Sequence, residues 1–404
     1  MVLEKAIDYF SIKYIFVFLT IYFTFIPFLS DINLVTTITM FFVLLGFISF
    51  LYGYESDKYF KLDLKYEKNI NLNIMLSIGY IFLLNDYVNG IENITSVKTI
   101  DDYTKSYFVE NHDSLYLSIL TLSLFYIKYF FYAILITKNK ILFYLVFISQ
   151  ILLMFNDSTR LVALFPFIVF IIYGYYFGYI VVNLKRVILV LVSIPLLFVV
   201  LLLARGKTDG LNYFEIISNI IDNLSYERFI GMLKIALESF QSFKDLSLIV
   251  TENFVHIESG IIRIFFMPIS RSVWEDKPDS ISRLISREYN PSQYIDGGGT
   301  VATIYADAFI NGHIVGLLLI LFGFGVISKI IYNTMKKNTD INSYQKSMLV
   351  MFYSLFIFQF LYYFRGFLSE FSWKTILLIL IFYSLYKLQY LNFNKKHTIL
   401  KRTI

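Results

Sequence analysis

Long apolar runs recur along this chain and are separated by polar connections. They fall at residues 12–29, 34–54, 70–88, 114–136, 141–155, 161–182, 187–204, 312–332, 346–364 and 371–388. A helix needs about 20 apolar residues to cross the hydrocarbon core of a bilayer, and most of these runs approach that length. The alternating pattern of a transmembrane β-barrel is absent. The pattern therefore predicts an all-α polytopic membrane protein with about ten transmembrane helices.

Basic residues are distributed unevenly between the two alternate sets of connections. The short loops of one set carry only Lys98, Lys105, Arg160 and Arg365. The other set carries Lys5, Lys58, Lys61, Lys65, Lys68, Lys138, Lys140, Lys185, Arg186, Lys336, Lys337, Lys346, Lys387, Lys395, Lys396, Lys401 and Arg402. Because short cytoplasmic loops are enriched in Lys and Arg, this asymmetry predicts that both termini are cytoplasmic.

One connection is much longer than the others and divides the chain into three parts. Residues 1–204 are predicted to form an N-terminal bundle of about seven spans. Residues 205–311 form a large outer loop, and residues 312–404 hold three spans and a cytoplasmic tail. Apolar residues recur at helical spacing in the loop, at Phe214, Ile217, Ile221, Leu224, Phe229, Leu233, Leu237 and Phe240. We expect amphipathic helices that form a cap, either as a lid alone or around a site.

The composition narrows the chemistry that the chain can perform. Hydrophobic residues make up 57% of the chain and charged residues 16%, which is outside the range of soluble domains. The absence of Cys excludes disulfides and thiolate chemistry, and four His make a histidine metal cluster improbable. A net charge of +5 is too small to indicate nucleic-acid binding. Phosphate-loop, HExxH and GxSxG motifs are absent.

Arginines are the notable surplus on the predicted outer face. Arg160, Arg205 and Arg365 lie at span ends, and another basic group lies late in the large loop, at Arg263, Arg271, Lys277, Arg283 and Arg287. Guanidinium groups bind phosphate or diphosphate through paired N–H donors and keep their charge when buried. The alternative is that these side chains extend to the membrane interface without binding a ligand.

The stretch "IDGGGTVATIYADAFINGHIVG", residues 295–316, combines a glycine run with two titratable residues. Gly297, Gly298 and Gly299 would let backbone N–H groups approach a ligand, although a flexible hinge explains them equally well. Asp307 or His313 would serve as a general base, or each is a satisfied polar residue on an inward helix face.

Lys128 is the clearest charge within a span. It pairs with a lipid phosphate or a carboxylate, or else extends to the interface or lies against a backbone carbonyl, which is the interpretation we favour from sequence.

A series of short motifs resembles the Wzy-type O-antigen polymerases. The motifs are "DSTR" (157–160), "ARG" (204–206), "PISRSVWEDKP" (268–278), "GGGT…YADAFINGHIVG" (297–316) and "RGFLSEF" (365–371). "PISRSVWEDKP" is the most specific of them. This chain differs from the family pattern in two places, with Asp307 where Glu is common and Ile-Ser between Pro268 and Arg271.

The resemblance implies a GT-C-like architecture related to the O-antigen ligases, in the inner membrane of a Gram-negative bacterium. It implies a polymerase that transfers a growing glycan from undecaprenyl diphosphate to an incoming lipid-linked repeat unit at the periplasmic face. The implied partners are lipid-linked oligosaccharides, membrane lipid and a chain-length-determining co-polymerase, with no metal or other cofactor and no nucleic acid.

The arginines and the resemblance together give a hypothesis for the site. Arg271 and Lys277 hold the diphosphate next to Trp274, which suits the lipid–water interface. Four arginines complete a basic bowl, with Arg287 also among the catalytic candidates: Arg160, Arg205, Arg287 and Arg365. Arg271, Asp307 and His313 are the other catalytic candidates. The alternatives are a lipid-linked oligosaccharide flippase, an O-antigen ligase, or a membrane scaffold.

Overall fold

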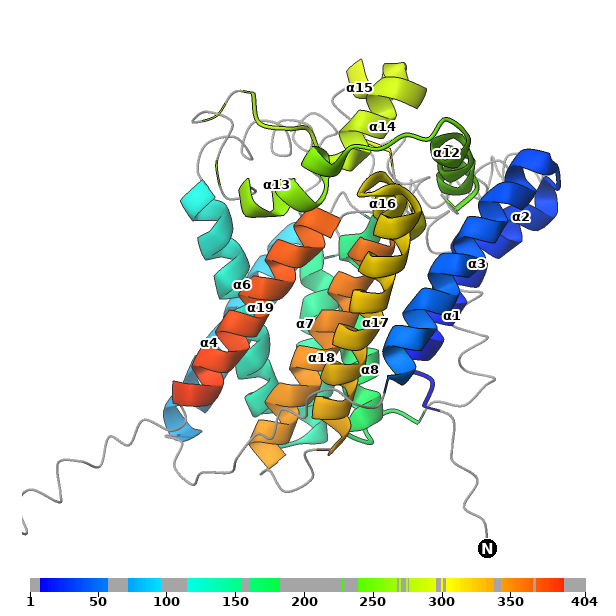
Figure 1. Ribbon diagram of the computed structural model, residues 1–404. Coiled ribbons are helices and arrows are strands. Elements are labelled where there is room, and N and C mark those ends of the chain that lie inside the picture. The colour runs from blue at the N-terminus through cyan, green and yellow to red at the C-terminus, as the bar shows by residue number, and fades with distance from the viewer. Residues whose placement is uncertain are drawn as a thin grey trace, which may run out of the picture.

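The protein is described by a computed structural model. The structure describes residues 8–56, 72–95, 115–154, 160–181, 227, 239–266, 269, 274, 276–295, 299–300, 303–337, 343–365 and 368–388. Within these ranges the chain is helical and has no β-strand. Long helices stand side by side in a bundle, and shorter helices cover one end of it (Figure 1). The all-α prediction is confirmed for this part of the chain.

Six helical segments of the described chain are long and apolar enough to cross a membrane. They are the run Ile12–Ser30, formed by α1 (Ile12–Thr20), η1 (Ile21–Phe25) and α2 (Ile26–Ser30), followed by α3 (Leu34–Glu55), α4 (Leu72–Thr95), α6 (Leu115–Ile136), α17 (His313–Lys337) and α18 (Ser343–Phe364). Shorter apolar stretches lie in α7 (Lys140–Met154), α8 (Arg160–Tyr176) and α19 (Leu368–Leu388).

Each of these segments coincides with a predicted span. The span predicted at 187–204 lies outside the described residues, as do the helical patterns predicted between 214 and 237. The structure thus supports a polytopic helical membrane protein, while the count of about ten spans stays a prediction.

The bundle separates a buried helix from helices that present apolar side chains outward. Nearly all side chains of α18 are buried. In contrast, α3 and α4 expose large apolar side chains, such as Ile48 (60% exposed) and Leu84 (67% exposed). Exposed apolar surface on long apolar helices is what lipid tails cover. The outer helices are therefore suited to face lipid, and α18 forms the centre of the protein.

The pair α3 and α17 packs backbone against backbone. A Cβ added to Gly53 would lie 2.2 Å from the Phe322 carbonyl oxygen, and one added to Gly325 would lie 2.2 Å from the Phe50 carbonyl oxygen. Small residues at such crossings let helices approach closely in membranes. Ser49 adds a hydrogen bond across the contact, from its Oγ to the Leu318 carbonyl oxygen at 2.7 Å. The two helices form one tightly joined unit.

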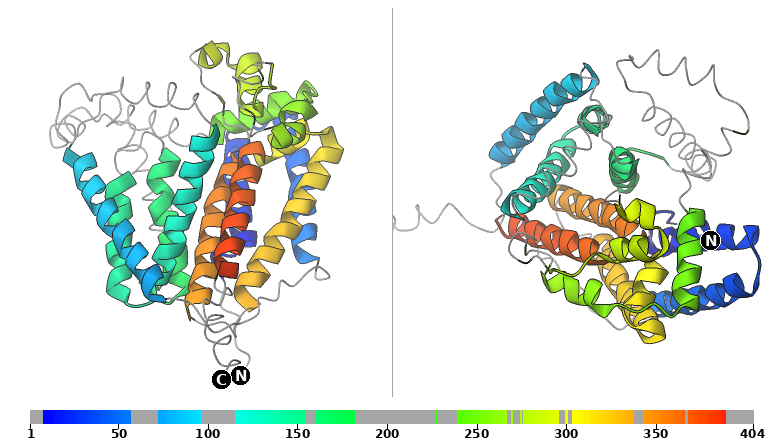
Figure 2. Two further views of the ribbon diagram at one scale, coloured as in Figure 1. Left: turned by 90° about the vertical axis from the view of Figure 1, so that its left-hand side faces the viewer. Right: turned by 90° about the horizontal axis from the view of Figure 1, so that it is seen from above.

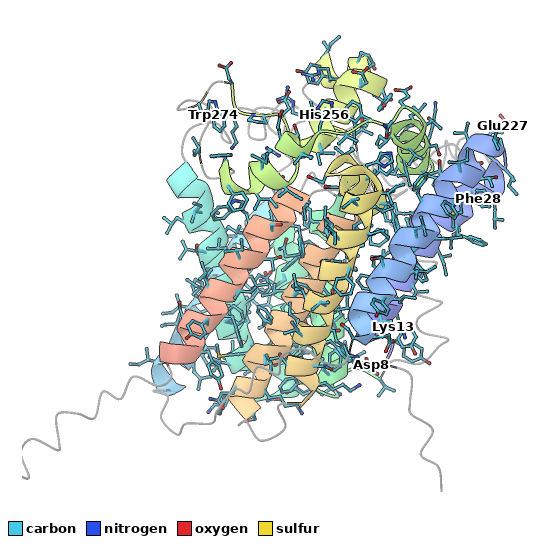
Figure 3. The ribbon with its side chains drawn as sticks, viewed as in Figure 1. Asp8, Lys13, Phe28, Glu227, His256 and Trp274 are labelled. Carbon is cyan, nitrogen blue, oxygen red and sulfur yellow. The ribbon has the colours of Figure 1, made fainter. Side chains whose placement is uncertain are left out.

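The cap is built from the large connection and lies across one end of the bundle (Figure 2). It contains α12 (Ser239–Thr251), η3 (Ile257–Ser259), α13 (Ile261–Phe266), α14 (Ile281–Tyr289), α15 (Pro291–Ile295) and α16 (Ile304–Ile310). His256 and Trp274 lie at this end, and Asp8 and Lys13 lie at the opposite end (Figure 3). The described part of the loop is therefore helical, and the amphipathic helices expected between 214 and 237 stay a prediction.

Candidate active site

Asp307 lies where the cap meets the bundle and is the centre of the candidate site. The Thr303 side chain begins α16 by accepting a hydrogen bond from the backbone N–H of Ala306 at 3.1 Å, as an N-cap does. Asp307 lies in the first turn of this helix and is 1% exposed. Its Oδ1 accepts from Asn311 Nδ2 at 2.8 Å, and its Oδ2 accepts from the backbone N–H of Leu368 at 2.9 Å. Both donors are neutral, and the described chain forms no ion pair with this carboxylate.

Burial sets the protonation behaviour of Asp307. Removal from water disfavours the charged form and raises the pKa of the carboxyl group to about 7, although the two donors act in the opposite direction. A carboxyl group with a pKa near the working pH can both accept and release a proton in a reaction. Asp307 is therefore suited to general acid–base chemistry.

Asn311 holds this carboxylate in place and links it to the cap. Its Nδ2 also donates to the backbone oxygen of Asp307 at 2.8 Å, and its Oδ1 accepts from the backbone N–H of Ile261 at 2.7 Å. The Ile261 contact fixes which end of the amide faces Asp307. A Cβ added to Gly260 would lie 1.8 Å from Asn311 Oδ1, so glycine is required at this position. The start of α13 is thus attached directly to the carboxylate site.

Two arginines lie at the same junction. Arg263 Nη1 on α13 donates to Ser369 Oγ at 3.2 Å, next to the Leu368 N–H that binds Asp307. Trp373 Nε1 donates to the Ile264 carbonyl oxygen at 2.5 Å and joins α13 to α19. Arg365 follows the end of α18, three positions before Leu368. The Arg263 guanidinium therefore lies beside the start of α19, where the Leu368 N–H also binds Asp307.

The predicted strip 268–278 is folded partly against itself. Lys277 is 8% exposed, and its Nζ donates to the Ile269 carbonyl oxygen at 2.8 Å. The Trp274 ring packs edge-on against Phe266 with centroids 5.2 Å apart. Arg271, the central residue of the diphosphate hypothesis, lies outside the described residues. Trp274 therefore joins the strip to the end of α13, whereas Lys277 bonds within the strip.

The other members of the predicted bowl are not all described. Arg205 lies outside the described residues, and the side chain of Arg160 does too, although the backbone of Arg160 begins α8. Arg287 is exposed on α14. On the same helix, the Arg283 guanidinium stacks on the Tyr294 ring at 5.2 Å. The structure thus places the Arg263 side chain at the start of α19 and the Arg365 backbone just after α18, and the complete bowl stays a prediction.

The glycine run has a packing role at its last residue. A Cβ added to Gly299 would lie 2.3 Å from Ser282 Oγ, so the close neighbour of this glycine is α14. The backbone N–H of Thr300 donates to the Ser282 carbonyl oxygen at 3.2 Å. Gly297 and Gly298 lie outside the described residues, so their predicted contact with a ligand stays a prediction.

His313 is the first residue of α17, directly after the turn that follows α16. Its φ of 58° lies in the left-handed region, which is uncommon for a residue with a side chain. Its ring packs against Phe309 with centroids 4.6 Å apart. The carboxylate oxygens of Asp307 bind Asn311 and Leu368, so Asp307 has the more developed acid–base environment of the two candidates.

A second buried carboxylate, Asp86, lies inside the bundle and was missed from sequence. Its Oδ2 accepts from Lys128 Nζ at 2.9 Å, from Tyr132 OH at 2.5 Å and from Gln150 Nε2 at 2.5 Å. The favoured interpretation of Lys128, as a snorkelling side chain or one bound to a backbone carbonyl, is wrong because a carboxylate on a neighbouring helix neutralises it. In the described chain, no group of three His, Cys, Asp or Glu could hold a metal ion.

No protein-family model, curated protein or solved structure matches this chain. The site must therefore be interpreted from its own geometry.

Proposed function

We propose that this protein is a membrane glycosyltransferase of the O-antigen polymerase type. It would transfer a growing glycan from undecaprenyl diphosphate to a lipid-linked repeat unit. The observation that carries the proposal is Asp307, a buried carboxylate without an ion pair, with a pKa near neutrality, at the junction of the cap and the bundle. The motif resemblance includes this residue.

In the proposed reaction, a hydroxyl oxygen of the acceptor sugar attacks the anomeric carbon of the donor. The new C–O bond forms as the C–O bond to the diphosphate breaks, and the diphosphate leaves with the bonding electron pair. The hydroxyl proton passes to the Asp307 carboxylate. General base catalysis of this kind contributes about 10²–10⁴-fold to a rate. The donor already carries an activated leaving group, so the reaction requires no nucleotide.

The arginines at the junction would stabilise the departing diphosphate. Negative charge grows on the leaving oxygens in the transition state, and preorganised cations that face this charge lower the barrier. Arg263 binds Ser369, next to the Leu368 N–H that binds Asp307, and Arg365 follows the end of α18. We assign them this role, together with Arg271 and Lys277 from the sequence hypothesis.

The distribution of charge supports an orientation with the cap on the outer face of a bacterial inner membrane. Lys336 pairs with Asp8 at the end of the bundle opposite the cap, at 2.9 Å. Lys140 begins α7 next to the turn that leaves α6, and Lys346 lies in the first turn of α18. Lysine-rich connections are typical of the cytoplasmic side, so the site would face the periplasm.

A deletion strain tests the proposal by the pattern of its lipopolysaccharide on a gel. Loss of a polymerase leaves a single repeat unit on the core, loss of a ligase leaves polymer on its lipid carrier, and loss of a flippase leaves neither at the surface. Wild-type protein should restore the ladder, and Asp307→Asn should not.

Asp245→Asn is the matched control because Asp245 is another buried acid in the cap. This variant should restore the ladder. A full ladder from Asp307→Asn at normal membrane levels would refute the proposal, as would a ligase or flippase pattern in the deletion strain.

A further inference from the structure

Tyr363 is a buried tyrosine whose hydroxyl has no hydrogen-bond partner in the described part of the chain. The residue lies near the cap end of α18 and is 0% exposed. Its ring packs edge-on against Phe324 at 4.7 Å and stacks on Phe371 at 5.0 Å. Neighbours on α17 and α19 therefore fix the ring. The hydroxyl oxygen nevertheless has no hydrogen-bond partner among the described residues.

Other buried tyrosines of the bundle are satisfied. The Tyr305 hydroxyl bonds to Thr20 Oγ1 at 2.7 Å, and the Tyr173 hydroxyl bonds to Ser347 Oγ at 2.6 Å. Tyr353 OH donates to the Phe10 carbonyl oxygen at 2.7 Å. A buried hydroxyl without a partner costs stability, and such groups are rare in folded proteins. The unsatisfied hydroxyl of Tyr363 therefore needs an explanation.

The position of Tyr363 supplies one. Tyr363 and Asp307 both contact the start of α19. The Leu368 N–H that binds Asp307 and the Phe371 ring that stacks on Tyr363 both belong to the first turns of α19. A ligand group that accepts a hydrogen bond from the Tyr363 hydroxyl and donates one to the Asp307 carboxylate would satisfy the tyrosine and add a donor to the carboxylate.

We propose that Tyr363 binds a hydroxyl group of the substrate sugar and holds it against Asp307. The ligand oxygen accepts from the Tyr363 O–H, and its own O–H donates to the Asp307 carboxylate. A phosphate oxygen does not fit between these groups, because it would accept from the tyrosine but repel the carboxylate. This inference rests on the proposed glycosyltransferase function and names the group that positions its acceptor.

The substitution Tyr363→Phe removes only the hydroxyl. We expect it to lower activity without lowering stability. The thermal midpoint of the purified protein should stay the same or rise, because no hydrogen bond within the protein is lost. The rate of chain extension from purified lipid-linked repeat units should fall at least tenfold, with a raised KM for the acceptor. A merely structural tyrosine would not give this split.

Tyr353→Phe is the matched control at the opposite end of the bundle. It removes a hydroxyl that bonds to Phe10, so its thermal midpoint should fall while its extension rate per folded molecule is kept. If Tyr363→Phe lowers the midpoint in the same way and keeps its rate per folded molecule, the inference is wrong.

Failure of this inference can be distinguished from failure of the proposed function. Wild-type extension rates in Tyr363→Phe combined with an inactive Asp307→Asn would overturn only the role of Tyr363. Full activity in both variants would overturn both. Loss of extension in both variants, with an unchanged thermal midpoint for Tyr363→Phe, supports both.

Discussion

Two buried carboxylates of this protein have opposite environments. Asp86 lies between the spans and accepts hydrogen bonds from Lys128, Tyr132 and Gln150, so a cation neutralises it. Asp307 lies beneath the cap and has only neutral donors at both oxygens. A carboxylate that is paired with a cation keeps its charge and fixes its neighbours, whereas an unpaired one can exchange a proton. The difference favours a structural role for Asp86 and supports the catalytic role proposed for Asp307.

The largest effect should come from breaking the ion pair within the spans. Lys128→Met leaves the Asp86 charge buried without a cation, and such a loss costs about 3–5 kcal/mol. We expect a large drop in folded protein after extraction in detergent, measured by size-exclusion chromatography and thermal midpoint. The double variant Asp86→Asn with Lys128→Met removes both charges and should recover most of this loss. A double variant as unstable as the single one would contradict a structural role for the pair.

The next effect is the pH dependence that Asp307 gives to stability. An unfolded Asp releases its proton near pH 3.8, whereas Asp307 keeps it to about pH 7. The native state therefore binds more protons in this window, so the free energy of unfolding falls as pH rises from 4 to 7 and is level above it. Each pKa unit corresponds to about 1.4 kcal/mol, which gives a total of about 4 kcal/mol.

Asp307→Asn should lose this slope. The thermal midpoints of the variant and the wild type are to be measured between pH 5 and 8. The midpoint of the variant minus that of the wild type should increase as the pH rises to about 7 and stay constant above it. Burial also raises the pKa of Asp245, to about 6, but this residue is present in both proteins and its contribution cancels. Parallel curves for the two proteins would show that Asp307 does not titrate in this range.

A smaller loss of stability should distinguish Tyr132, whose hydroxyl is hydrogen-bonded, from Tyr363, whose hydroxyl has no partner among the described residues. Tyr132→Phe removes one donor to Asp86 and should cost about 1–3 kcal/mol, because the hydroxyl is buried and bonded to a carboxylate. Tyr363→Phe should cost nothing by the same measurement. Equal losses of thermal midpoint for the two variants would remove the distinction between the two environments.

The smallest effect should come from a charge pair at the surface. Lys13 pairs with Glu55 at the end of the bundle opposite the cap, where both side chains are at least one-third exposed. Such pairs contribute about 0–1 kcal/mol, so Lys13→Met should shift the thermal midpoint only slightly. A loss as large as that of Lys128→Met would mean that burial does not decide the strength of these pairs.

The positions of the long apolar helices could be predicted from sequence, because a helix in lipid must present an apolar surface over its whole length. Apolar runs such as 34–54 and 346–364 coincide with α3 and α18, since spanning helices must satisfy their own backbone. Asp307 was also singled out from sequence, because a carboxylate next to a span boundary is conspicuous, and its catalytic role stays a prediction. Its partner Asn311 follows at a spacing of four, which puts both on one helix face, and this signal was available but unused.

Other parts of the site could not be predicted in this way. Leu368 and Ile261 contribute backbone N–H groups, which are common to every residue except proline and leave no mark in a sequence. Asp86 and Lys128 are 42 positions apart and meet only because α4 packs against α6. Tyr363 is one of 33 tyrosines, and what distinguishes it is a missing partner, which only a structure reveals.

The glycine contact between α3 and α17 limits how a lipid-borne substrate could enter from the bilayer. A lipid-linked substrate can enter laterally only between two neighbouring helices whose side chains can change rotamer and open a gap. At Gly53 and Gly325 the main chains of the two helices are in direct contact, so no side chain can move aside at these two positions. A lateral opening would therefore have to form between other helices of the bundle. The α3–α17 pair would stay in place while the neighbouring helices move.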